Sequence, residues 1–205
     1  MWKLICILGL LLGTLTAASL PQSGTETRAF APGGTLKLSL PVGSVDIRPG
    51  QDTKIVLHYF VRPPHHIFSD SGSRLVDLDF QVHGSDATVQ LSYPDKGGND
   101  HPSVDVILEV PARTSLDIEL GVGKMTLAAG LQGDQHLKDG VGDIIVHGAD
   151  RNRVATLDAS TGVGSVHGGA WGDGQGFVAH ELHGQGTGTY HLHAETGVGS
   201  VRIDP

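Results

Sequence analysis

The sequence has one cysteine, few aromatic residues and no cluster of basic side chains. Cys6 lies in an apolar run near the N-terminus, so a chain that has lost this run contains no thiol and holds its fold without a disulfide. Aromatic residues make up only 5% of the chain, which leaves few candidates for the aromatic platforms of a sugar-binding groove. With a formal net charge of −8 and no basic cluster, the chain is a poor candidate for binding nucleic acid or anionic lipid.

Glycine, in contrast, is abundant. The 205 residues include 30 glycines, and β-branched residues alternate with polar ones over much of the chain, a pattern typical of strands separated by many turns. No segment has the apolar spacing of a long helix. These features predict an all-β protein of one domain or one elongated array.

The first 19 residues are interpreted as a secretory signal peptide. Lys3 precedes an apolar run from Leu4 to about Leu15, and small residues suitable for cleavage follow near Ala18. An uncleaved membrane anchor is the competing interpretation, but the run is shorter than the roughly 20 residues of a spanning helix. We therefore expect an exported protein, periplasmic or at the cell surface, with no membrane insertion after cleavage.

A seven-residue pattern recurs in the second half of the chain. "GVGKMTL" begins at Gly121, "GVGDIIV" at Gly140, "GVGSVHG" at Gly162 and a looser copy, "GTGTYHL", at Gly186, with intervals of 19, 22 and 24 residues. This is the period range of solenoids, in which each repeat stacks on the next. "GVGSVRI" at Gly197 follows only 11 residues after Gly186 and breaks the period.

Alternation within each unit predicts which side chains face the interior, because successive strand residues point to opposite faces. The predicted interior includes Ile118, Met125, Ile144, Val146, Val166 and Val201. The two glycines of each unit predict a corner with backbone angles closed to other residues, and the valine between them is expected to point inward. A phosphate-binding loop is disfavoured because no helix follows any of these motifs.

Residues 25–115 repeat this chemistry less regularly. "PVGSVDI" from Pro41 is a degenerate unit, and further strands are predicted over 53–61, 74–84, 87–93 and 103–110. We expect longer, partly antiparallel strands that cap one end of the stack. The predicted organisation is one elongated β domain over 25–205, with an irregular part at 25–115 and the Gly-x-Gly repeats at 116–205.

The order of these motifs resembles that of a known family. "FAPGGTLKLSL", "GSVDIRP", "VDVILEVPARTSLDIELGVGKMTL" and the recurring "GVGDIIVHG" units are similar to the bacterial putative-adhesin family of β-strand-repeat proteins, a domain of unknown function. The resemblance covers nearly all of the chain after the signal peptide. It implies a right-handed, single-stranded β-helix-like solenoid that is exported or surface-attached, and it implies no catalytic residues.

Histidine is the residue type that most favours a metal site. The sequence has 12 histidines, and His191 and His193 lie two apart in a predicted strand, so they share a face. His167 occupies an equivalent outward position in an earlier unit and would supply a third imidazole if the units at Gly162 and Gly186 stacked in register. Three protein ligands and a water make a catalytic zinc site. No cysteine or spaced carboxylate completes a set, so we predict no metal, no cofactor and no catalytic residue.

Aligned outward positions form the other candidate site. Asp117, His136, Asp158 and His193 each stand four residues before a regular corner, so stacked units would form a ladder of acids and histidines about 4.8 Å apart. One interpretation is a carbohydrate-active or metal-dependent enzyme. The favoured one is a non-enzymatic scaffold whose flat face or end binds an envelope or surface component, protein or glycan. Trp171 is interpreted as a residue folded over the end of the stack.

Overall fold

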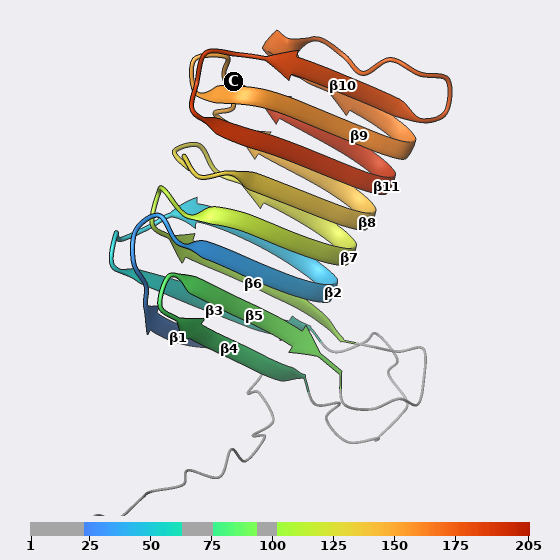
Figure 1. Cartoon of the computed structure of the whole chain (residues 1–205). Helices are drawn as coiled ribbons and strands as arrows, with labels where there is room; N and C mark the ends of the chain where they lie inside the picture. Colours follow the sequence, from blue (N-terminus) through green and yellow to red (C-terminus); the bar gives the residue numbers. More distant parts are fainter. Residues whose placement is uncertain (1–22, 63–75, 94–101) are drawn as a thin grey trace, which may run out of the picture.

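The computed structural model describes residues 23–62, 76–93 and 102–205, and the predicted signal peptide lies outside these ranges. The described chain confirms the all-β prediction (Figure 1). Its single helical element is a 3-10 turn, and no helix of this part is long and apolar enough to cross a membrane. The elements are β1 (Ser23–Ala29), β2 (Thr35–Pro49), β3 (Lys54–Arg62), β4 (Asp77–His83), β5 (Asp86–Ser92), β6 (Ser103–Val110), β7 (Ser115–Leu127), β8 (Gln135–His147), β9 (Val154–His167), η1 (Gly169–Trp171), β10 (His180–Gln185) and β11 (Tyr190–Asp204).

Five long strands, β2, β7, β8, β9 and β11, each bend sharply at a corner near the middle of the strand (Figure 1). The corner is the Gly-Val-Gly of the repeat, with Pro41 replacing the first glycine in β2. The strands pair in parallel and in register, so that Gly123, Gly142 and Gly199 lie side by side at successive corners. Each bent strand therefore contributes a first half to one sheet face and a second half to the opposite face, with the core between them.

The second glycine of each corner is required by its backbone. Gly123, Gly142, Gly164 and Gly199 have φ angles of 153°, 150°, 144° and 144°, a region that side chains with a Cβ rarely adopt. A Cβ at any of them would also collide with a carbonyl oxygen of the adjacent strand. These angles confirm the prediction that the glycines form corners.

The interior is the one that the alternation predicts. All six predicted inward residues are buried, with exposed fractions of 2% or less. Val45 and Ile47 of the degenerate unit are equally buried. The core is continuous from the N-terminal strands to the C-terminal end of the stack.

The corner valines differ from the prediction. Val122, Val141, Val163 and Val198 are 46–52% exposed instead of pointing inward. The cause is the close approach of backbones at the corner, since the flanking glycines bring their Cα atoms against carbonyl groups of the neighbouring strand. The valine side chain is left on the convex, solvent side of the bend.

The stacking order departs from the order along the chain. The central strands are arranged β2-β7-β8-β11-β9-β10, so β11 pairs with both β8 and β9. The corner of β11 is formed by Gly197 and Gly199, the unit that broke the sequence period. Gly186 makes no such corner: its N–H donates to the Ala155 carbonyl in the connection between β10 and β11.

The N-terminal strands close the other end of the stack. β5 pairs in parallel with the first half of β2, and β6 pairs in parallel with the second half. Beyond them β3, β1 and β4 run antiparallel to their neighbours, as expected for this region. The expectation that they would be longer than the repeat strands is wrong, since they have 7–9 residues against 13–15 in the bent strands. β6 has the bounds predicted for the strand over 103–110.

Trp171 covers the C-terminal end of the core. It lies in η1, is only 7% exposed, and its Nε1–H donates to the Ala149 carbonyl at 2.7 Å. The Arg151 guanidinium lies 4.8 Å from the centroid of its ring, a cation–π contact. The residues inserted between β9 and β11 thus form a cap, and Trp171 is part of that cap instead of a sugar platform.

Candidate binding face

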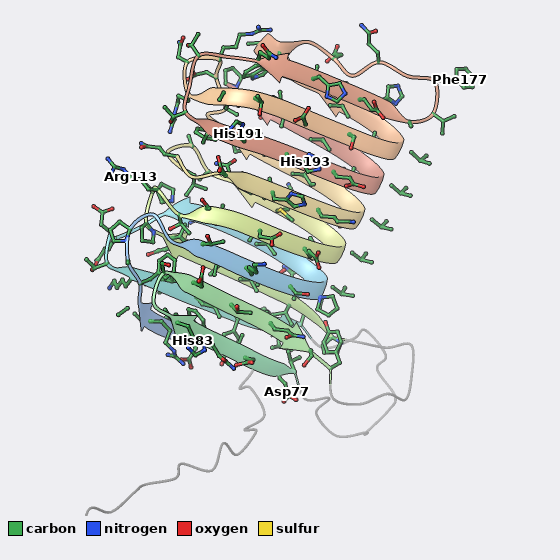
Figure 2. All side chains as sticks on the ribbon, viewed as in Figure 1. Asp77, His83, Arg113, Phe177, His191 and His193 are labelled. Atoms are coloured by element: carbon green, nitrogen blue, oxygen red, sulfur yellow. The ribbon has the colours of Figure 1, made fainter. Side chains whose placement is uncertain are left out.

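The outer face is the solvent side of the sheet formed by β4, β5, the first halves of β2, β7, β8, β11 and β9, and β10 (Figures 1 and 2). Alternation sends every second residue of these strands to solvent. His191 and His193 of β11 both project from this face in Figure 2. Because the strands are in register, the outward residues line up in rows that cross the strands.

The central row combines charged side chains with histidines. Its members, in stacking order, are Lys37, Asp117, His136, His193, Asp158 and His183. Lys37 Nζ lies 3.4 Å from Asp117 Oδ2, and both side chains are well exposed. A second row, one step nearer the corners, carries Glu119, Lys138, Glu195, Ser160 and Glu181 in the same order.

Two histidines stand next to each other in the central row. His136 and His193 are direct partners across β8 and β11, and their rings stack with centroids 4.8 Å apart. Stacking in chain order would have separated them by Asp158. The ladder of acids and histidines is therefore present as predicted, but the insertion of β11 changes its order.

Asp158 and His183 form the closest pair of the row. His183 Nδ1 lies 2.6 Å from Asp158 Oδ1, and its Nε2 lies 3.7 Å from Glu181 Oε2. The hydrogen bond to Asp158 raises the pKa of His183, and the nearby carboxylate charges add to this effect. The imidazole is fully exposed, so this pair shapes the charge of the face more than the stability of the fold.

The three histidines considered for a metal site do not converge. His167 lies in the second half of β9, on the opposite sheet, where its Nδ1 is 3.2 Å from Asp173 Oδ1. The ring of His191 is hydrogen bonded to Thr156 Oγ1 at 2.6 Å. Within the described ranges no group of three His, Cys, Asp or Glu side chains has a metal-binding arrangement. That the protein carries no metal or cofactor remains a prediction.

One residue of chemical interest, Asp139, was not predicted from the sequence. Asp139 is buried at the inner side of the β8 corner, with an exposed fraction of 1%. Burial raises its pKa to about 6; the carboxylate of Asp143 adds to the rise, and the nearby Val141 N–H offsets part of it. Its inward place was evident from alternation, since the same position holds Leu120 in β7 and Thr161 in β9.

Stacked, bent β-strands with in-register glycine corners define the class of this protein, an all-β fold built from stacked strand units. Neither known family models nor curated proteins matched the sequence. Solved structures do. The fold is shared with a "putative cell adhesion protein" from Clostridium sporogenes, with a TM-score of 0.54 and 16% identity over 89% of this chain and 99% of that one.

Two further solved structures show weaker similarity. A "putative adhesin" from Bacteroides fragilis aligns with a TM-score of 0.24 and 10% identity, over 91% of this chain and 99% of that one. A "putative lipid binding protein" from Parabacteroides distasonis aligns with a TM-score of 0.29 and 9% identity, over 90% of this chain and 74% of that one. At 16% identity, the similarity to the Clostridium sporogenes protein is one of fold.

Proposed function

We propose that this protein is an exported, non-enzymatic β-solenoid that binds another envelope or surface component, protein or glycan, through its outer face. The observation that carries this proposal is the in-register ladder of exposed acids, histidines and lysines that crosses six strands of one sheet, from β2 to β10. Such rows offer repeated hydrogen-bond donors and acceptors at fixed spacing. A rigid stack presents them without reorganisation.

The size of the face suits a macromolecular partner. Eight strands about 4.8 Å apart, with first halves of about six residues at about 3.3 Å each, give a surface of about 34 by 20 Å. This approaches the roughly 800 Å² that each partner contributes to a standard interface. The exposed side chains are mostly charged or polar, as in transient interfaces.

Enzymatic chemistry has less support from the geometry. The carboxylates of Asp117 and Asp158 are exposed and lie in a straight row instead of converging in a pocket. A catalytic acid or base is usually held in a cleft where burial tunes its pKa. The fold shared with a protein described as a cell adhesion protein agrees with the binding interpretation.

The test compares the two sheets of one protein. Full-length wild type, a His136→Ala/His193→Ala/Lys138→Glu variant of the outer face, and a Thr126→Ala/Arg202→Ala variant of the opposite sheet would be titrated onto envelope fractions of the producing cells. We expect saturable binding that the outer-face variant weakens at least tenfold and the opposite-sheet variant retains.

Equal binding by both variants, or no saturable binding, would overturn the assignment of the face. The same fractions would be assayed for release of soluble sugars. Turnover by wild type that is lost in Asp158→Asn would replace the binding function with an enzymatic one.

A further inference from the structure

The position just before each corner lies inside the bend and follows a hydrogen-bonding pattern. Along the stack it is occupied by Leu40, Leu120, Asp139, Thr196 and Thr161. Thr161 Oγ1 of β9 donates to the Gly199 carbonyl of β11 at 3.3 Å, and Thr196 Oγ1 of β11 donates to the Gly142 carbonyl of β8 at 3.2 Å. Each threonine thus ties its corner to the adjacent strand on the β2 side.

Asp139 is the next member of this series. The same step along the stack, from β8 to β7, leads from Asp139 to the Gly123 carbonyl, because Gly142, three residues after Asp139, pairs with Gly123. The position that a Cβ on Gly142 would occupy is 2.7 Å from Asp139 Oδ2 and collides with the Gly123 oxygen, so both oxygens border the same small volume. A carboxylate there faces a carbonyl lone pair, whereas a carboxylic acid has an O–H to donate.

We propose that Asp139 is a proton-dependent latch between β7 and β8, which closes when its neutral carboxyl group donates a hydrogen bond to the Gly123 carbonyl. Neither carboxyl oxygen makes another hydrogen bond of ordinary geometry to a described residue. A buried carboxylate that has only the nearby Val141 N–H to offset its charge is costly, and protonation removes the charge and supplies the donor together. The raised pKa of Asp139, about 6, agrees with this geometry.

The surroundings leave Asp139 as the titrating group inside the corner. β7 places Leu120 against it and β11 places Thr196, neither of which ionises. The charged side chains nearby on the packed strands, namely Lys124, Lys138, Asp143 and Glu195, are on the solvent side. Of these, Asp143 raises the pKa of Asp139 while its own Oδ1 accepts from Ser200.

The sign of the pH effect follows because the pKa of Asp139 in the folded protein lies above 3.8, the ordinary value for an aspartate. Between the two values the folded protein retains a proton that the unfolded chain has lost. This contribution to stability therefore declines as the pH rises, most steeply up to about 6. For a shift from 3.8 to about 6, the unfolding constant rises about tenfold between pH 5 and 7.5 through this group alone.

The test measures denaturant unfolding of the full chain at pH 5 and 7.5 for wild type, Asp139→Thr and Asp139→Asn. Both replacements carry a neutral donor, so we expect the wild-type rise in the unfolding constant to exceed theirs about tenfold. Asp143→Asn, on the solvent side of the same strand, should keep most of the wild-type dependence. The same dependence in wild type and both Asp139 variants would overturn the latch.

A second measurement does not depend on the variants folding. Carboxyl ¹³C NMR of wild type should show Asp139 titrating near pH 6, with amides of β8 that bond to β7 exchanging more slowly, relative to their intrinsic rates, below this midpoint. A midpoint near 4, or exchange protection that is the same on both sides of the midpoint, would show that no latch exists.

Discussion

Alanine replacements at three glycines separate two free-energy costs, backbone strain and steric collision, that act together at Gly164. Its φ angle of 144° disfavours any Cβ, and that Cβ would also collide with the Gly199 carbonyl. Backbone strain of this kind costs about 1–3 kcal/mol, and overpacking against an ordered backbone costs about 1–3 kcal/mol. We expect Gly164→Ala to lower the free energy of unfolding by about 3 kcal/mol or more.

Two other glycines serve as matched controls, because alanine at each of them introduces either the backbone strain or the collision, but not both. Gly84, in the β4–β5 turn, has a φ of 64° but nothing within 4 Å of its added Cβ, so Gly84→Ala should cost about 1–2 kcal/mol. Gly162 has no positive φ, but a Cβ there would lie 2.6 Å from the Gly197 oxygen. Gly162→Ala should therefore cost about 1–3 kcal/mol through overpacking alone.

The assay is urea unfolding followed by circular dichroism at 25 °C, with the slope of each transition compared to confirm that the same surface is exposed. Gly164→Ala should be the most destabilised of the three variants. If it unfolds at the same urea concentration as Gly84→Ala, the close packing of adjacent corners contributes nothing measurable and the account of the bend is wrong.

Three further predictions concern the core, the cap and the outer face. Ile144→Ala should cost about 2–5 kcal/mol of unfolding free energy because it empties a fully buried site, while the outward Thr126→Ala should cost under about 0.5 kcal/mol; equal costs would refute the inward assignment. Trp171→Ala should lower the free energy of unfolding by about 3–5 kcal/mol; a variant that melts at the wild-type temperature would show that the cap does not seal the core. Asp158→Asn should lower the pKa of His183, because the hydrogen bond is the main cause of its rise; a proton NMR titration of the imidazole that does not move would contradict the pairing.

The alternation of apolar residues predicted the interior because strand geometry has a period of two whatever the neighbours are. Met125 and Ile144 are therefore buried as expected. The same reasoning failed for Val141, since alternation does not extend through a bend in which two glycines bring neighbouring backbones together. The direction of a corner side chain depends on that inter-strand approach, which no single repeat encodes.

The partners of each strand were harder to predict than the strands. The in-register ladder of Asp117 and His136 followed from equal spacing to the corners. The contact between His136 and His193 could not be predicted in this way. Either β9 or β11 could pair with the free edge of β8, and tertiary structure decides which of them does. Asp139 could have been predicted from the sequence, since an acidic residue at an inward position of a strand indicates a buried carboxyl group.

The place of β11 between β8 and β9 has a consequence for how the protein folds. During synthesis β9 and its cap are complete before residues 190–204 exist, yet they have no direct pairing with β8. The stack therefore cannot grow by adding each strand to the previous one, and the pairing of β8 with β11 closes a loop of more than 40 residues. Folding of the C-terminal half is an assembly step that awaits its final strand, and a ribosome-stalled chain lacking residues 190–204 would expose the open edges of β8 and β9.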